Sequence, residues 1–569
     1  MAFQDKKIIE GVYLAAVNRA FLRFVIVAVL FLMAFTAIGV RLVYLTVGGE
    51  KDISSHVIYA KKEHPRRADI IDRNGALLAT SLKTASLYVD QTLVNDPVQL
   101  ASKLQEVLPQ MPFEKLVEKL EGKKRFVWVY RNLSPNQQYE VNAIGDPALA
   151  FRNEYKRMYP QGNMFSHIIG YTNIDGRGIA GMELAYDETL VTGDKELSLT
   201  IDYRLQHILR KELGAAIDEF SAKGGSGIIM DIKTGEVLSM VSLPDFDPYY
   251  PANARPEALF NNSTLGVFEM GSTFKLFSVA LALETAGIRL KDSFDTTDPI
   301  KRGRFRIRDF HPEKRPLSIP EIFMYSSNIG SARLAMEIGN ERMQNFFADL
   351  GFFSPVEFEL PEIGRPLIPN PWREINTLTS SYGHGIAVTP LHLIRAGAAI
   401  INSGALPWPY LVTKENEEKT RKLLERAEIQ VISPATSKKM RQMMELTILE
   451  GTAKKAYVKG YRIGGKTGTA EKVTAKGYSR KKLLSSFIAA FPMDDPAYII
   501  LVIVDEPKGT KKSFGYATGG WVAAPVVAKV VKQMAPLVGL APRDDTKAKE
   551  SLLTAMKPYL DKDRKVASH

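Results

Sequence analysis

One apolar run near the N-terminus constrains this chain more than any other feature. It is 17 residues long, from Phe24 to Val40, and contains no charged residue. An α-helix of about 20 apolar residues spans the hydrocarbon core of a bilayer. Arg23 and Arg41 border the run; their aliphatic stems can place both charges at the interface, and Tyr44 adds an aromatic anchor. We therefore predict a single membrane-spanning helix within residues 24–47.

Two other interpretations of the run stay open. A helix buried in a protein core would fit the composition, but such helices rarely lack a polar face over this length. A cleavable signal peptide would fit the small-x-small pattern Ala37-Ile38-Gly39, but signals usually have a shorter apolar core and a shorter polar stretch before it. The membrane anchor explains the run best.

Basic residues are distributed unequally around the run. Lys6, Lys7, Arg19 and Arg23 precede it, whereas only Arg41 and Lys51 follow it closely. Cytoplasmic flanks of membrane helices carry the excess of Lys and Arg. Residues 1–23 are therefore expected to form a cytoplasmic tail, and the rest of the chain to face outward.

Composition excludes several kinds of protein. At 569 residues the chain is too long for one hydrophobic core, so we expect two or more domains outside the anchor. The net charge of +12 arises from 75 basic residues interleaved with 63 acidic ones, without an arginine-rich block, so no nucleic-acid binding is predicted. The chain has no cysteine, and its eight histidines lack a metal-binding spacing such as H-E-x-x-H. We expect neither a metal nor a cofactor.

Residues 48–220 mix short strand-like and helical segments. Asn74-Gly75 predicts a tight turn between residues 69–72 and 76–78, and a helix-rich segment follows from about Pro97 to Glu121. A glycine-rich run, residues 176–181, comes later. No obvious arrangement for nucleophilic chemistry occurs here, so we predict a non-catalytic pedestal domain.

Residues 221–541 have the pattern of an α+β domain. Residues 226–231 and 236–241 predict an antiparallel hairpin, residues 485–491 and 497–504 predict a second pair of strands, and helical patterns fill the interval. Strands at both ends with helices between them indicate an antiparallel sheet with a helical insertion. Residues 542–569 alternate in charge, and we expect a mobile C-terminal tail.

The sequence Gly271-Ser272-Thr273-Phe274-Lys275 opens an apolar helical stretch. A serine three residues before a lysine places hydroxyl and amine on one helix face, within reach of each other. Unpaired N–H groups of a first helical turn can stabilise an oxyanion beside the serine. Ser272 is therefore the candidate nucleophile and Lys275 its base. The base must be neutral, and lowering its pKa from about 10.4 to about 7 costs roughly 4 to 5 kcal/mol.

Two further segments supply the groups that such a site needs. Lys466, in Gly464-Gly465-Lys466-Thr467-Gly468-Thr469, could be a second cation that lowers the pKa of Lys275. Threonines alternating with glycine suit a strand edge along which a peptide lies, and Lys466, Thr467, Gly468 and Thr469 would hold a substrate carboxylate. Ser326-Ser327-Asn328, on a turn between helices, offers a hydroxyl for proton relay and an amide for a substrate carbonyl.

Each short motif also occurs elsewhere in the chain by chance. Ser479-Arg480-Lys481-Lys482 fits S-x-x-K, Ser134-Pro135-Asn136 fits S-x-N, and Lys233-Thr234-Gly235 fits K-T-G. A single match is thus weak. These decoy motifs lie in charged or turn-forming contexts and in the wrong order, whereas the three candidate segments follow one another inside one predicted domain.

In this order the three motifs resemble those of penicillin-binding proteins and class A β-lactamases. The resemblance extends along nearly the whole chain and is closest to class B penicillin-binding proteins. Further segments similar to family signatures are residues 67–75 (with Ala68 in place of a usual glycine), 178–183, 199–202, 382–385 and 388–391, while Met270 replaces a common proline. It implies a transpeptidase domain of the penicillin-binding and serine β-lactamase type on an elongated pedestal of the dimerisation type, anchored by one helix.

The resemblance implies a peptidoglycan D,D-transpeptidase without its own glycosyltransferase. Ser272 would attack the penultimate D-alanine carbonyl of a stem peptide, Lys275 would take its proton, and Ser326 would relay a proton to the leaving amine. Asn328 would complete the catalytic set, and the N–H groups of Ser272 and Thr469 would form the oxyanion hole. A neighbouring stem's amine would then take the acyl group. β-Lactams are expected to acylate Ser272.

Within the class, the chain is most similar to the division-specific type of Gram-negative bacteria, the penicillin-binding protein 3 type. That type implies a single-pass protein of the inner membrane, a periplasmic catalytic domain, and work with a polytopic glycosyltransferase that polymerises lipid II, alongside other division proteins. Alternatives are an elongation-specific class B enzyme, a β-lactamase or β-lactam sensor, and a non-catalytic division scaffold. No E-x-x-L-N-like segment lies between Asn328 and Lys466, which disfavours a β-lactamase.

Overall fold

The structure, a computed structural model, describes residues 2–47, 66–193, 195–303, 305–413, 429–474 and 477–560. The chain divides into two compact units, Met1–His64 and Pro65–His569. Residues 48–65, at the start of the predicted pedestal, and 561–569, at the end of the predicted tail, lie outside the described residues.

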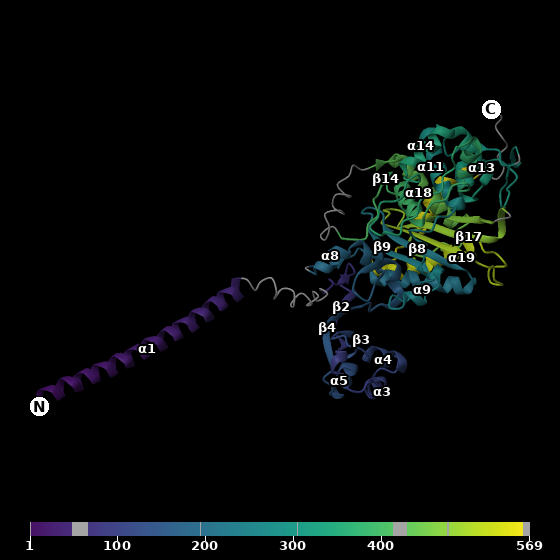
Figure 1. Cartoon of the computed structure of the whole chain (residues 1–569). Helices are drawn as coiled ribbons and strands as arrows, with labels where there is room; N and C mark the ends of the chain where they lie inside the picture. The colour runs from purple at the N-terminus through teal and green to yellow at the C-terminus, as the bar shows by residue number, and fades with distance from the viewer. Residues whose placement is uncertain are drawn as a thin grey trace. The chain divides into compact units, whose positions relative to one another are not determined.

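The first unit is one long helix, α1 (Ala2–Val47), drawn in purple in Figure 1. Within it, Phe21–Val43 has a mean hydropathy of 2.6 and is long enough to cross a membrane. The side chains of this span are exposed, which does not fit a helix buried in a core. The predicted helix is therefore confirmed, with a span slightly longer than the charge-free run.

A five-stranded sheet forms the pedestal. Its strands are β1 (Ile70–Ile71), β2 (Leu77–Val89), β3 (Val127–Leu133), β4 (Leu149–Met158) and β7 (Leu197–Ser198). The predicted turn is present: β1 and β2 pair antiparallel, and Gly75 takes a φ of 83° that favours glycine. The predicted helical segment contains α3 (Pro97–Val107) and α4 (Phe113–Leu120), whose leucines pack on β2 and β3 together with α5 (Pro135–Ala143).

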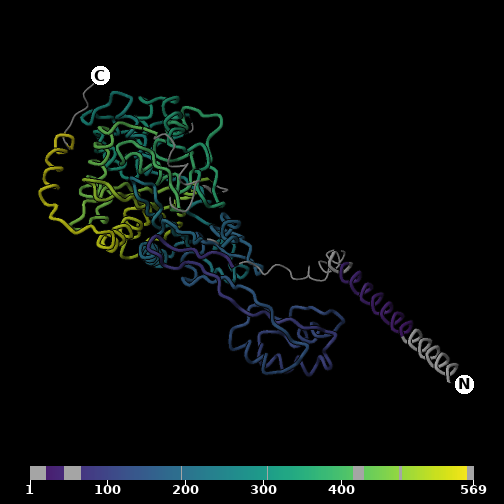
Figure 2. The backbone as a smooth tube through the Cα atoms, turned by 90° about the vertical axis from the view of Figure 1, so that its left-hand side faces the viewer, coloured from purple at the N-terminus to yellow at the C-terminus, as the bar shows by residue number. Residues whose placement is uncertain are grey.

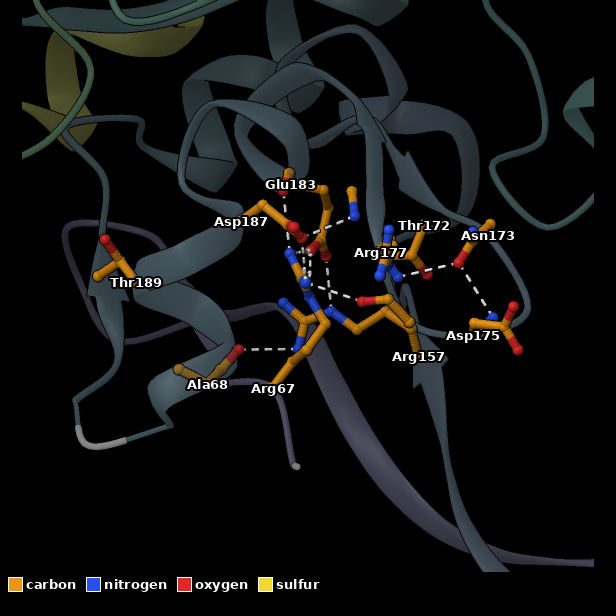
Figure 3. Close-up of polar contacts among 12 residues, drawn as sticks. Arg67, Ala68, Arg157, Thr172, Asn173, Asp175, Arg177, Glu183, Asp187 and Thr189 are labelled. Atoms are coloured by element: carbon orange, nitrogen blue, oxygen red, sulfur yellow. Dashed lines mark hydrogen bonds and ion pairs between the residues drawn. The ribbon is translucent and has the colours of Figure 1, made fainter. Parts of the chain in front are cut away.

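A buried ion-pair network holds the base of the pedestal together (Figure 3). The carboxylate of Glu183, in α7 (Gly181–Ala185), is fully buried between Arg67 and Arg157, whose Nε atoms lie 2.9 and 2.6 Å from its oxygens. Arg67 also pairs with Asp187 at 2.5 Å. Next to this network, the backbone N–H of Gly181 donates to Glu362 across 3.0 Å, which links the pedestal to the catalytic domain.

The catalytic domain is built on a second five-stranded sheet in the order β16-β17-β18-β8-β9. The bounds are β8 (Gly224–Asp231), β9 (Val237–Leu243), β16 (Gly464–Thr474), β17 (Gly477–Phe491) and β18 (Tyr498–Asp505). All pairs are antiparallel, so both predicted strand pairs are confirmed. Strand β16 lies at one edge of this sheet.

Alternating side chains send the sheet's residues into two separate cores. Ile229, Val502 and Phe487 pack with α9 (Tyr203–Glu219) and α19 (Gly519–Leu537) on one face. Ile228 and Leu501 pack on the other face with the helical insertion, which Figure 1 shows above the sheet. Helix α9 precedes the predicted domain boundary at residue 220, yet it packs against the catalytic sheet.

The helical insertion occupies the interval between β9 and β16, as expected. It contains η4 (Gly271–Phe274), α11 (Lys275–Thr285), α12 (Ile319–Met324), α13 (Asn328–Ile338), α14 (Asn340–Asp349), α15 (Glu374–Ser380), α16 (Pro390–Ile401) and α18 (Pro434–Leu449). Helix α11 is buried along its first nine residues. Rings of Phe274 and Phe277 pack with those of Phe347 and Phe352 at centroid distances of 5.0–5.7 Å.

The expectation of a mobile C-terminal tail is wrong for residues 546–560. They form α20 (Thr546–Met556), seen in yellow in Figure 2, and η6 (Lys557–Tyr559). Leu552 and Met556 are buried in the catalytic core, and the hydroxyl of Ser318 donates to the carbonyl of Tyr559. The charges of this segment alternate because they lie on the outer side of an amphipathic helix.

Candidate active site

Ser272 lies on a tight 3-10 turn that is pressed against strand β16. A Cβ atom on Gly271 would come within 2.8 Å of the Thr469 carbonyl, and one on Gly468 within 2.8 Å of the Met270 carbonyl. Neither position can therefore hold a side chain without a shift of backbone. These glycines bring the serine turn and the edge strand into direct contact. The sequence predicts the nucleophile at the start of an α-helix; the turn η4 precedes α11 instead, and Lys275 begins the helix proper.

The side chain of Lys275 lies at the centre of the three predicted segments. Its Nζ atom is 2.7 Å from Ser272 Oγ, 2.6 Å from Asn328 Oδ1, and 2.8 and 3.2 Å from the carbonyl and hydroxyl oxygens of Ser326. An amine offers at most three N–H donors. With four oxygens around it, the neutral amine can keep its lone pair directed at the Ser272 hydroxyl.

Lys466 reaches the same centre from the edge strand. Its Nζ atom donates to Ser326 Oγ across 2.8 Å, so the two lysines share one hydroxyl. Ser326 has a left-handed backbone, with a φ of 62°, on the turn between α12 and α13. A non-glycine residue there is strained, and such strain concentrates at functional sites. The structure thus brings Ser272, Lys275, Ser326, Asn328 and Lys466 together.

Burial controls the protonation of both lysines. Removal from water lowers the pKa of Lys275 to about 7, against an opposing influence from the Asp309 carboxylate. Burial first and the neighbouring Lys275 second hold the pKa of Lys466 well below its usual range. The sequence predicts a second cation as a cause of the lowered pKa of Lys275, but desolvation is the larger cause. The site therefore provides a neutral amine near physiological pH.

Asp309 is a site residue that the sequence motifs do not reveal. Its carboxylate accepts hydrogen bonds from the Ser327 hydroxyl at 2.7 Å and from the backbone N–H groups of Asn328 and Ile329 at 2.5 and 2.9 Å. It thereby caps α13 and fixes the turn that presents Ser326 and Asn328. The side-chain amide of Asn328 also donates to the carbonyl of Arg308, so one of its N–H groups is already engaged. Nothing in the sequence marks Asp309, because its role depends on a contact across the fold.

Threonine hydroxyls line the other side of β16. Thr467 Oγ1 lies 2.8 Å from Thr452 Oγ1, and Thr469 Oγ1 accepts the backbone N–H of Gly519 across 3.1 Å. The Thr469 hydroxyl keeps its own proton free to donate. Together with Lys466 these groups form a polar pocket wall that suits an anionic end group.

An aromatic cluster closes the opposite end of the site. The ring of His384 stacks on Tyr478 at 5.5 Å, and the Tyr478 hydroxyl donates to Glu269 across 3.0 Å. Burial lowers the pKa of His384 to about 4, so this ring is neutral, and burial raises the pKa of Glu269. The Tyr382 ring centroid lies 6.0 Å from Lys275 Nζ. This cluster adds to the dry surroundings that lower the pKa of the lysine.

The three decoy motifs lie away from this centre. Ser134 caps helix α5 in a capping box with Gln137. Lys233 is in the turn between β8 and β9 and pairs with Asp495, with both side chains more than half exposed. Ser479 begins a strongly exposed stretch of β17. Order and context therefore distinguish the site from chance matches correctly.

Comparison with known proteins agrees with this geometry. Residues 225–532 match the penicillin-binding protein transpeptidase domain, and residues 62–206 match the penicillin-binding protein dimerisation domain. The chain is 37% identical to the probable peptidoglycan D,D-transpeptidase FtsI of Caulobacter vibrioides, over 85% of this chain and 83% of the relative. It is 27% identical to the peptidoglycan D,D-transpeptidase FtsI of Escherichia coli K12, over 82% of each.

A solved structure has the same fold. Penicillin-binding protein 3 of Mycobacterium tuberculosis, in complex with aztreonam, matches with a TM-score of 0.66 at 21% identity, over 85% of this chain and 98% of that chain. A serine and a lysine on one turn, beside an edge strand, define a serine acyltransferase. The chain belongs to the class B penicillin-binding proteins, with their transpeptidase and dimerisation domains.

Proposed function

We propose that this protein is a peptidoglycan D,D-transpeptidase of septal cell-wall synthesis, with Ser272 as nucleophile and Lys275 as base. The observation that carries the proposal is the 2.7 Å contact between Lys275 Nζ and Ser272 Oγ, made by an amine whose pKa is lowered to about 7. The similarity to the two FtsI proteins supports the division role.

In the first half-reaction Ser272 is acylated. Its Oγ attacks the carbonyl carbon of the penultimate D-alanine while Lys275 takes the hydroxyl proton. The bond from that carbon to the terminal D-alanine nitrogen breaks, and the leaving amine receives a proton through Ser326. The backbone N–H groups of Ser272 and Thr469 stabilise the oxyanion.

In the second half-reaction an amine of a neighbouring stem takes the acyl group. Its nitrogen attacks the ester carbon, Lys275 accepts its proton, and the ester bond to Ser272 breaks as the serine regains a proton. The product is an amide crosslink. A β-lactam enters the first half-reaction in the same way, but its leaving nitrogen stays attached, which leaves a long-lived acyl-enzyme.

We assign substrate binding to the outer edge of β16 and to the polar wall beside it. An edge strand offers backbone groups to an extended peptide. Lys466, Thr467, Gly468 and Thr469 hold the terminal carboxylate; a bound carboxylate favours the charged form of Lys466, so substrate binding brings a proton to this lysine.

We place the N-terminal tail, residues 1–23, in the cytoplasm and the catalytic domain in the periplasm, with residues 24–47 as the inner-membrane anchor. Residues 48–202 form the pedestal and residues 203–560 the catalytic domain, because α9 packs with α19 on the catalytic sheet. Through the anchor and the pedestal the protein works with a polytopic glycosyltransferase that polymerises lipid II, and with other division proteins.

Depletion of the protein in its own host tests the division role. Cells that lose a septal enzyme grow into filaments, and a plasmid copy restores division while a Ser272→Ala copy does not. Loss of rod shape without filaments would instead favour an elongation enzyme, and full rescue by Ser272→Ala would favour a scaffold. A sporulation role is a second candidate, because the chain is also 31% identical to stage V sporulation protein D of Bacillus subtilis; sporulation defects in depleted cells that divide normally would support it.

A further inference from the structure

Three aromatic rings and a lysine form an exposed cluster on the loop between β18 and α19 and at the start of α19. The ring of Trp521 stacks on Tyr516 at 5.8 Å and meets Phe514 edge-on at 5.7 Å. Lys455 Nζ lies 4.0 Å from the Trp521 ring centroid. We name Phe514, Tyr516, Trp521 and Lys455 the aromatic platform. Phe514 is 78% exposed, the largest exposed fraction among the large hydrophobic residues that the structure describes.

The platform is held rigidly in spite of its exposure. The backbone N–H of Gly515 donates to the Thr510 carbonyl, and that of Tyr516 donates to the Ser513 carbonyl, each across 2.9 Å. Within this closed turn Phe514 has a left-handed φ of 52°. A bulky residue in that conformation is strained. The turn therefore keeps an apolar ring in water at a cost in stability, which points to a function outside folding.

The same loop continues directly into the active site. Gly519, two residues before Trp521, donates its N–H to Thr469 Oγ1, and a Cβ on Gly519 would lie 2.5 Å from the Gly468 carbonyl. A Cβ on Gly520 would lie 2.4 Å from the Thr452 carbonyl. The platform thus adjoins the wall that holds the carboxylate, on the side where the terminal D-alanine leaves.

Several lysines surround the platform. Lys508, Lys511 and Lys512 on the loop, and Lys455 under the tryptophan, are exposed. Within the described part of the chain no acidic side chain forms an ion pair with any of these four. A cluster of cations with no acidic neighbour attracts anions and favours their approach.

We infer that the aromatic platform docks the acceptor, an uncrosslinked peptidoglycan strand whose stem peptide supplies the attacking amine. This inference rests on the proposed transpeptidase function and extends it to the second substrate. The acceptor must enter where the first D-alanine departs, which is the side that the platform adjoins. Its sugars have apolar faces that stack on exposed aromatic rings, and its stems carry carboxylates that complement the lysines.

Partitioning of the acyl-enzyme tests the inference. The full-length protein in detergent is acylated with a small D-alanyl thioester donor, and hydrolysis and aminolysis are followed at rising concentrations of either uncrosslinked glycan strands or free D-alanine as acceptor. The variants are Phe514→Asn with Tyr516→Ala, and Lys511→Gln with Lys512→Gln; asparagine tolerates the left-handed backbone at position 514. Tyr139→Ala is the matched control, since Tyr139 is 76% exposed on α5 of the pedestal.

Either double variant should raise the half-saturating concentration of glycan strands by about tenfold, equivalent to ~1.4 kcal/mol of binding. The response to D-alanine should not change, and the lysine variant should lose most of its salt dependence. Values equal to those of Tyr139→Ala would overturn the inference, as would an equal loss with both acceptors, which would place the defect in the chemistry.

A membrane surface and an inactive enzyme give distinct results in the same experiments. If the lysine variant loses binding to vesicles of anionic phospholipid while aminolysis by glycan strands is unchanged, the occupant is a membrane surface and the inference is wrong. If the wild-type protein is not acylated at all, the proposed function itself fails, and the inference fails with it. Normal acylation with altered partitioning by glycan strands alone supports both.

Discussion

Lys275 and Lys466 donate to the same oxygen, the hydroxyl of Ser326, at 3.2 and 2.8 Å. Two ammonium groups so close together in a dry site repel each other, so at most one of them is charged at neutral pH. The shared hydroxyl connects the base beside Ser272 to the lysine of the edge strand. A proton can therefore move between the two ends of the site without bulk water.

Acylation should depend on pH through Lys275. Its pKa is lowered to about 7, and only the neutral amine can take the proton of Ser272. Below pH 7 the ammonium form accumulates, so the acylation rate should fall about tenfold per pH unit, and above pH 7 it should level off. Stopped-flow acylation by a fluorescent penicillin between about pH 5.5 and 8.5 measures this. A flat profile over that range would exclude Lys275 as the titrating base.

Replacement of Asp309 should alter both rate and pH profile. The Asp309 carboxylate raises the pKa of Lys275, so Asp309→Asn should move the midpoint of the acylation profile to lower pH. The loosened Ser326–Asn328 turn should also lower the plateau rate by about 3- to 30-fold, the effect of weakening one or two buried hydrogen bonds. Asp495→Asn, in an exposed pair, is the control. A slower reaction with an unmoved midpoint would leave only a structural role for Asp309.

Removal of the shared hydroxyl should cost more than removal of an ordinary serine. Ser326→Ala breaks the contact between the two lysines and the proton route to the leaving amine, so acylation should slow by roughly 10²- to 10⁴-fold. Ser479→Ala, in the decoy S-x-x-K motif, should leave the rate unchanged. Steady-state release of D-alanine from a stem pentapeptide gives both values. A loss of less than about threefold in Ser326→Ala would remove Ser326 from the proton path.

Neutralisation of Glu183 should destabilise the pedestal without touching the active site. Glu183→Gln leaves Arg67 and Arg157 buried without their shared carboxylate, and breaking a buried pair in this way costs about 3–5 kcal/mol. Urea unfolding of the full chain should show the shift, while Lys233→Gln at the surface should change stability by less than about 1 kcal/mol. Equal stabilities of the two variants would mean that the network is not needed to hold the pedestal.

Local patterns predict most of the fold for reasons that the structure makes clear. The membrane helix, the turn at Asn74-Gly75 and both strand pairs depend on neighbours in sequence, so periodicity and turn residues reveal them. The motif segments could be joined into one site because their order matches a known class. The prediction for the charged C-terminal segment is wrong, since burial of Leu552 and Met556 depends on contacts with distant helices.

Other features of the site have no local signal. Asp309 acts across a loop on the next helix, and the contact between Gly519 and Thr469 joins segments 50 residues apart. The degree of burial around Lys275 is likewise a property of the whole insertion. It arises from Tyr382, His384 and the phenylalanine cluster together, so the cause of the lowered pKa could not be predicted from the spacing of two lysines.

The central claim is that Ser272 forms the acyl-enzyme, and intact-protein mass spectrometry after exposure to a β-lactam tests it most directly. The full-length protein, Ser272→Ala and Ser479→Ala are compared. We predict an adduct of one β-lactam that maps to Ser272, persists for many minutes, is absent from Ser272→Ala and is unchanged in Ser479→Ala. An adduct that survives in Ser272→Ala, or one that hydrolyses within seconds, would contradict this claim.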